Sequence, residues 1–103
     1  MTVAVRLVEI LAEAAGELAG AEVAQGPVAT IWSVGGQPFA ALSVGTAEFR
    51  LDAVLAPAAR RTPDTTGSLR GKEWVSFSPA ILDRYAEDRL RAWFAAAYRR
   101  AAG

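Results

Sequence analysis

Apolar positions recur with helical spacing at both ends of the chain. Near the N-terminus this spacing predicts a helix from Val3 to about Leu18, with Thr2 as its N-cap. A second stripe predicts a longer helix from Asp83 to about Arg100. The apolar positions of this second helix are Leu90, Trp93, Phe94, Ala97 and Ala101. We expect both stripes to pack against the core.

Between the two helices, residues 28–52 form an apolar run that contains two glycine-bearing turns, which predicts a three-strand antiparallel meander. We expect Gly35-Gly36 to form a two-residue hairpin loop, because both residues tolerate the positive φ that such loops need. In this register Trp32 lies opposite Phe39. The two rings then form a cross-strand pair on one face of the sheet.

Gly45-Thr46 is expected to form the second two-residue loop, because a type II′ turn needs glycine at its first central position. Leu42 then lies opposite Phe49. Alternation along the three strands assigns one set of side chains to the core face: Ala29, Ile31, Ala40, Leu42, Val44, Ala47, Phe49 and Leu51. It assigns another set to the opposite face: Trp32, Phe39, Ser43, Glu48 and Arg50.

The segment after the meander alternates polar turns with one further apolar strand. Asp52 is expected to cap a short helix over Ala53 to Arg61, and residues 61–68 are expected to form a polar loop. Glu73 to Phe77 is predicted to be a fourth strand. The sequence therefore predicts a single α+β domain over residues 1–103, with a meander sheet of four to five antiparallel strands and the N- and C-terminal helices packed on one face.

Three segments carry a resemblance to a known family: VGGQPFAALSV (residues 34–44), SLRGKEWVSFSP (68–79) and EDRLRAWFAAAYRRAA (87–102). Together with the order of elements, they resemble the MmcQ/YjbR-like proteins. Gln37 stands where many members of that family carry lysine. The resemblance implies a small α+β domain similar to secretion-chaperone-like folds. It also implies a protein for which DNA binding has been suggested and no catalytic role is established.

The composition argues against most kinds of active site. The chain has no histidine and no cysteine, and its 11 basic and 11 acidic residues cancel. Nucleophile–histidine catalysis, cysteine-ligated zinc and disulfides are therefore excluded, and the sequence predicts no catalytic residues, no metal and no cofactor. The N-terminal segment lacks the uninterrupted apolar run of a signal peptide or a membrane span, so we expect a cytoplasmic protein without a membrane partner.

Charge is distributed unevenly between the two halves of the chain. Residues 1–50 carry two basic and five acidic side chains, net −3, whereas residues 51–103 carry nine and six, net +3. Four basic side chains bracket the polar loop of the second half: Arg60, Arg61, Arg70 and Lys72. Guanidinium groups and neighbouring hydroxyls can bind phosphate oxygens. The alternative is a solvated loop whose charges pair with Asp64 and Glu73.

The predicted outer face of the sheet carries two aromatic rings where polar side chains are expected. Trp32 and Phe39, with Arg50 on the next strand, could form a platform that stacks on a base or a peptide. The alternative is that a helix or loop covers the pair, or that a bulge near Pro38 turns one ring inward.

These observations indicate a non-catalytic binding domain. The first hypothesis is weak binding of nucleic acid, DNA included, or of another anionic partner through the basic loop. The alternative hypothesis is a protein-interaction or self-association module that uses the Trp32/Phe39 face as an apolar patch. The sequence leaves the oligomeric state open.

Overall fold

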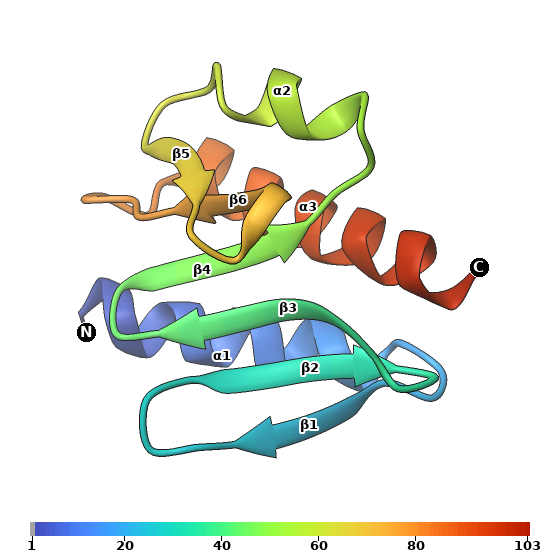
Figure 1. Ribbon diagram of the computed structural model, residues 1–103. Helices are drawn as coiled ribbons and strands as arrows, with labels where there is room; N and C mark the ends of the chain where they lie inside the picture. Colours follow the sequence, from blue (N-terminus) through green and yellow to red (C-terminus); the bar gives the residue numbers. More distant parts are fainter. Residues whose placement is uncertain (1) are drawn as a thin grey trace.

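The computed structural model describes residues 2–103, which form three helices and one six-stranded antiparallel sheet (Figure 1). The helices are α1 (Val3–Gly16), α2 (Leu55–Ala59) and α3 (Arg84–Ala102). The strands are β1 (Glu22–Gln25), β2 (Thr30–Val34), β3 (Gln37–Ser43), β4 (Thr46–Arg50), β5 (Thr65–Ser68) and β6 (Gly71–Phe77). They lie in the order β1-β2-β3-β4-β6-β5. The α+β class predicted from the sequence is confirmed.

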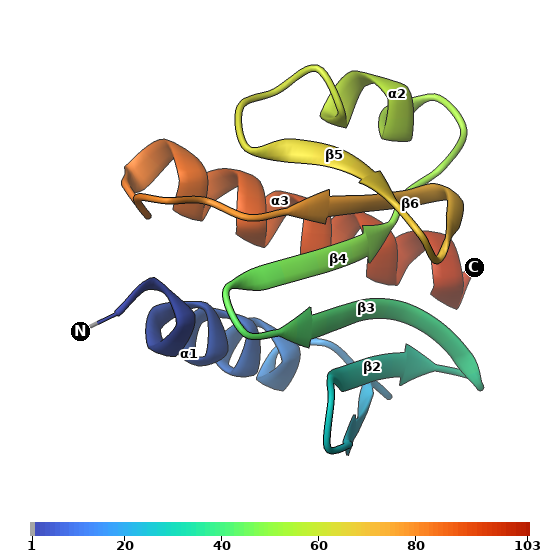
Figure 2. The same cartoon turned by 60° about the vertical axis from the view of Figure 1, so that its left-hand side comes forward.

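The two long helices lie on the same face of the sheet (Figures 1 and 2). Helix α3 crosses β2, β3 and β4, and α1 packs beside α3. The short helix α2 lies at the β5–β6 end of the sheet. In the part of the chain that the structure describes, no helix covers the opposite face, so side chains on that face are free to form a site.

Side-chain caps fix where the helices begin. The Thr2 hydroxyl accepts a hydrogen bond from the Val5 amide at 3.3 Å, and the Asp83 carboxylate accepts one from Ala86 at 2.9 Å. Each cap satisfies an amide that has no partner within its helix. The Asp52 carboxylate does the same at the start of α2, which is shorter than the predicted helix over residues 53–61.

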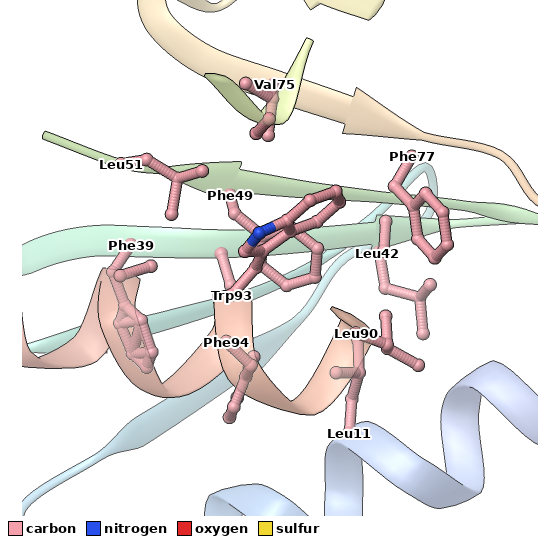
Figure 3. Close-up of a cluster of buried hydrophobic side chains, with 14 of the residues drawn as sticks. Leu11, Phe39, Leu42, Phe49, Leu51, Val75, Phe77, Leu90, Trp93 and Phe94 are labelled. Atoms are coloured by element: carbon pink, nitrogen blue, oxygen red, sulfur yellow. The ribbon is translucent and has the colours of Figure 1, made fainter. Parts of the chain in front are cut away.

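The core lies between the helices and the sheet and is organised around α3 (Figure 3). The Phe94 ring meets the rings of Trp32, Phe39 and Phe49 at centroid distances of 5.4, 5.3 and 6.4 Å. Trp93 packs edge-on against Phe77 at 5.4 Å. Edge-to-face contacts of this kind add to the free energy gained by burying apolar area. The predicted apolar stripe of α3 is therefore confirmed as the side that faces the core.

The first hairpin has the predicted loop but a different register. Gly35 and Gly36 both have positive φ, at 56° and 78°, as a two-residue hairpin loop requires. A bulge then follows: Ser33 pairs with Pro38 but Trp32 pairs with Ala40, which leaves Phe39 as the extra residue. Because a shift of one residue turns a strand's side chains to the other face, Trp32 points into the core. The predicted Trp32/Phe39 cross-strand pair is wrong.

The second loop also differs from the prediction. Ser43 pairs with Thr46, so the two loop residues are Val44 and Gly45, and Gly45 takes its positive φ of 74° at the second position of the loop. Leu42 consequently lies opposite Ala47 rather than Phe49. A shift of two residues keeps each side chain on its face, so Phe49 is buried as predicted. Val44, predicted to lie in the core, is 92% exposed in the turn.

Two strands were not predicted. Strand β1 pairs along the outside of β2, and β5 forms within the segment predicted to be a polar loop, where it pairs with β6. They extend the expected sheet of four to five strands to six among the described residues. Of the helices described, none combines the length and the hydrophobicity that a transmembrane span needs.

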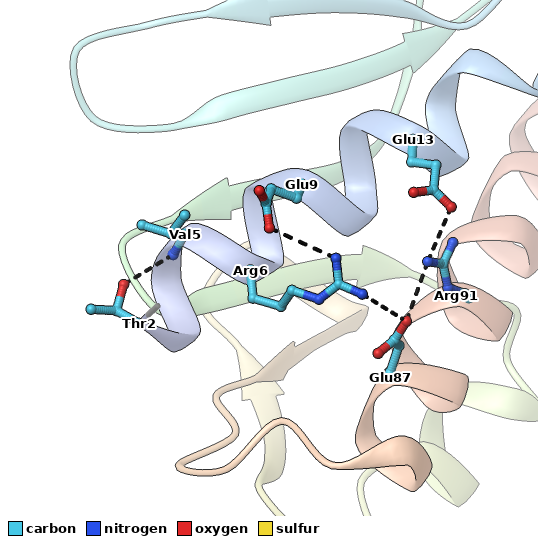
Figure 4. Close-up of polar contacts among 7 residues, drawn as sticks. All are labelled: Thr2, Val5, Arg6, Glu9, Glu13, Glu87 and Arg91. Carbon is cyan, nitrogen blue, oxygen red and sulfur yellow. Dashed lines mark hydrogen bonds and ion pairs between the residues drawn. The ribbon is translucent and has the colours of Figure 1, made fainter.

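A polar network joins the two long helices at the edge of the core (Figure 4). The Glu87 carboxylate accepts hydrogen bonds from Arg6 of α1 at 3.2 Å and from Arg91 of α3 at 3.3 Å. Arg91 also contacts Glu13 of α1 at 3.2 Å. These ion pairs link α1 to α3 across their solvent-facing sides and fix the position of one helix relative to the other.

Candidate anion-binding site

Basic side chains gather at the end of the sheet where β4 stops and the β5–β6 hairpin turns. Three of them, with one aromatic ring, line a shallow hollow of about 320 Å³: Arg50, Arg70, Lys72 and Trp74. Arg50 of β4 lies directly opposite Trp74 of β6. Lys72 precedes Trp74 by two positions on the same strand, so their side chains leave the sheet on the same face. We call this hollow the basic pocket.

Arg70 is held in place by three contacts. Its Nε donates to Glu48 Oε1 at 2.9 Å, and its guanidinium lies 5.6 Å from the centre of the Trp74 ring. Its backbone amide donates to the Ser68 hydroxyl at 3.1 Å, and that hydroxyl donates to the second oxygen of the Glu48 carboxylate. The hairpin turn is thereby tied to β4, and the guanidinium is within cation–π distance of an indole.

Glu73 joins two further arginines to the edge of the basic pocket. Its carboxylate oxygen lies 2.8 Å from Arg100 and 3.5 Å from Arg50. Arg100 comes from the last turn of α3, so a residue distant in sequence contacts Glu73, which lines the pocket. One carboxylate shared by two guanidinium groups leaves an excess of positive charge at this point.

Arg60 and Lys72 add charge without a carboxylate partner in the described residues. The Arg60 guanidinium donates to the backbone carbonyl of Lys72 at 3.0 Å, which brings the end of α2 to the pocket. The Lys72 side chain is exposed, as is Arg61. No side-chain contact ties Arg61 to the pocket within residues 2–103. Of the four predicted anion-binding residues, the structure thus brings Arg60, Arg70 and Lys72 together and leaves Arg61 apart.

The cluster as a whole is cationic. Five basic residues (Arg50, Arg60, Arg70, Lys72 and Arg100) face two acidic ones (Glu48 and Glu73), which gives a formal net charge of +3. If the basic residues belonged only to a solvated loop, they were expected to pair with Asp64 and Glu73, and the observed ion pairs are different. Arg70 pairs with Glu48, and the described structure has no ion pair between the four predicted residues and either Asp64 or Glu73.

The predicted aromatic platform is not at the surface. Trp32 and Phe39 are 5% and 0% exposed and pack against Phe94 of α3. The burial agrees with the alternative in which a helix covers the rings and a bulge near Pro38 redirects them. Arg50, the third predicted platform residue, lies instead in the basic pocket, 3.5 Å from Glu73. These two rings therefore contribute to stability and do not form an exposed stacking platform.

The aromatic ring that does reach the pocket is Trp74, which is partly exposed. Alternation along the predicted strand Glu73 to Phe77 places Trp74 on the face opposite Val75 and Phe77. Strand β6 begins at Gly71, two residues earlier than predicted, which puts Lys72 on the same face as Trp74. Their two-residue spacing is the signal in the sequence that could have joined them. Arg100 had no comparable signal, because only the packing of α3 brings it close.

The basic side chains and the partly exposed indole give this arrangement the means to bind an anion. No group of three or more carboxylates that could hold a metal ion occurs among residues 2–103. Comparison of the chain with known protein families, with curated proteins and with solved structures finds no match. The function is therefore argued from the geometry of the site itself.

Proposed function

We propose that this protein binds an anionic partner, and single-stranded nucleic acid in the first place, through the basic pocket. The observation that carries the proposal is the convergence of five basic side chains from β4, α2, the β5–β6 hairpin and α3 around one partly exposed tryptophan. Electrostatic attraction to phosphates supplies most of the affinity of such sites, and it does not depend on base sequence.

The geometry of Arg70 and Trp74 favours nucleic acid over a simple anion. The guanidinium and the indole form one continuous surface, because they lie 5.6 Å apart and are held there by Glu48. Flat aromatic and guanidinium groups stack on unpaired bases, whereas Lys72 and Arg50 are placed to contact the adjoining phosphates. The MmcQ/YjbR-like resemblance of the sequence agrees with this proposal.

Intrinsic fluorescence offers a direct test, because the three tryptophans differ in exposure. Trp32 and Trp93 are 5% and 7% exposed, whereas Trp74 is partly exposed beside the pocket. We expect a short oligothymidylate to quench the Trp74 emission and the Trp74→Phe variant to lose most of that quenching.

Replacing Lys72 by alanine should weaken binding several-fold. It should also reduce the slope of the binding constant against salt concentration by about the amount that one phosphate contact contributes.

The matched control is Arg84→Ala, which removes an equal charge at the opposite end of α3 from Arg100. Binding that is unchanged in Lys72→Ala, or weakened equally by Arg84→Ala, would show that the pocket is not the binding site. Wild-type protein that shows no quenching even at low salt would exclude nucleic acid as the partner.

A further inference from the structure

Exposed valines concentrate at one edge of the molecule, away from the basic pocket. The side chains in question come from α1, from the β1–β2 hairpin and from the turn after β3: Val5, Val8, Val23, Val28 and Val44. Their exposed fractions run from 49% for Val5 to 92% for Val44. Isolated exposed valines are common, but a continuous group marks an interaction surface.

These valines line two adjoining hollows between α1 and the β1–β2 hairpin, of about 320 and 330 Å³. Val8 belongs to both, Val5 and Val28 to the first, and Val23 and Trp32 to the second. None of the described residues that line either hollow carries a charge. In Figure 1, α1 lies behind β2 and β3, and β1 is the outermost strand on that side of the sheet. We call them together the valine groove.

Strand β1, beside the groove, is an open sheet edge. All four of its residues are exposed, and its pairing with β2 is regular. The opposite edge is different, because β5 carries a bulge at Gly67 and Ser68 and the end of α2 lies against it. Bulges and covering helices are how sheet edges are protected from pairing with other chains. Among the described strands, β1 has neither protection.

We propose that a second copy of this chain docks on this edge, with the two β1 strands pairing antiparallel about a twofold axis. Antiparallel pairing centred on Val23 sets Val23 opposite Val23 of the other copy and Glu22 opposite Ala24, so no like charges face each other. The axis is perpendicular to the sheet. The two sheets become continuous, and both α1 helices lie on the same side.

The charges of α1 are compatible with this arrangement. Glu9 pairs with Arg6, and Glu13 pairs with Arg91 of α3, so these carboxylates are engaged with the α3 side of the helix. The side of α1 that lines the groove carries Val8, Ala12 and Ala15 instead. An uncharged groove best fits an uncharged occupant, and a second α1 with its own valines supplies one.

The test is the oligomeric state of the full chain, measured by sedimentation equilibrium. We expect wild-type protein to be dimeric at about 0.5 mM and to dissociate on dilution, as mass action requires. Val23→Lys should raise the dissociation constant at least about tenfold, because it places two lysines in the dimer interface. Val54→Lys is the matched control, since Val54 is 84% exposed beside α2, and it should leave the dimer unchanged.

A second measurement does not depend on any variant. In the dimer the amides of residues 22–25 should exchange with solvent more slowly at high than at low protein concentration, whereas those of β5 should not change. A wild-type chain that stays monomeric at about 0.5 mM would overturn the proposal. A dimer that Val23→Lys and Val54→Lys leave equally intact, with no concentration-dependent protection in β1, would overturn it as well.

Discussion

At the scale of single residues, Phe94 joins the parts of the core. Its ring contacts Trp32 of β2, Phe39 of β3 and Phe49 of β4, so one side chain of α3 meets three neighbouring strands. It is 0% exposed. Removing it would open a cavity between α3 and the sheet that neither could close without moving.

We expect Phe94→Ala to lower the free energy of unfolding by about 3–5 kcal/mol, the usual cost of deleting a fully buried aromatic ring. The measurement is urea unfolding followed by circular dichroism. The control is Tyr85→Ala on the same helix, because Tyr85 is 71% exposed and should change stability by about 0.5 kcal/mol or less. Similar losses for both variants would contradict the burial described here.

Helical periodicity was enough to predict the buried stripe around Phe94, since it depends only on spacing along one helix. The orientation of Trp32 could not be predicted in the same way. It depends on a single extra residue, Phe39, in the partner strand, and that bulge turns β2 over. The sequence offers two adjacent apolar residues there, Phe39 and Ala40, and both are buried.

At the scale of elements, α1 is fixed to α3 by the Glu87 network as well as by the core (Figure 4). The Glu87 carboxylate is within 3.3 Å of two arginines from different helices, and its side chain is 27% exposed. Partial exposure reduces the strength of each ion pair. A carboxylate shared by two guanidinium groups nevertheless contributes more to stability than an isolated surface pair does.

We expect Glu87→Gln to lower the free energy of unfolding by about 0.5–1 kcal/mol at low ionic strength, with the difference shrinking at about 1 M salt because the charges are screened. Asp88→Asn is the control: Asp88 is exposed on the same helix and forms no ion pair in the described structure. Thermal unfolding at two salt concentrations would measure both variants. An equal effect of the two substitutions would mean that the network does not stabilise the contact between the helices.

The long elements were predictable and the short edge strands were not. Strand β6 was expected over Glu73 to Phe77 because Val75 and Phe77 alternate with polar residues. Strand β1 has only four residues, all exposed, and β5 reads TTGS, which is typical of turns. Strand β1 forms because β2 offers it a free edge, and β5 forms because β6 does. These edges exist only once the sheet has assembled, so the local sequence does not predict them.

At the scale of the whole molecule, the two proposed surfaces lie on separate parts of the fold. The basic pocket is built where β4, β6, α2 and the end of α3 meet, and the valine groove lies between α1 and the β1–β2 hairpin. The charge asymmetry between the halves of the chain predicted the first in outline. The position of Arg60, Arg70 and Lys72 around the polar loop could be read from the sequence. The position of Arg100 could not, because only the packing of α3 brings it close to Glu73.

The distance between the basic pocket and β1 determines where the two pockets lie in the proposed dimer. Pairing through β1 leaves both basic pockets exposed at the far ends of a continuous sheet, so two copies could contact one nucleic-acid strand or two. Linked sites bind a long strand more tightly than either site alone. A long oligothymidylate should therefore bind the wild type more tightly than Val23→Lys, whereas a short one should bind both equally.

Binding of an anionic polymer in the basic pocket can be observed residue by residue in an amide-shift titration. Wild-type protein would be titrated with a short oligothymidylate at low and at physiological salt. We predict shifts at Arg50 and in residues 68–74 that weaken as salt rises, because the basic side chains displace counterions from the phosphates when the strand binds. Shifts confined to α1 or to the start of α3, or no shifts at either salt concentration, would contradict binding in the basic pocket.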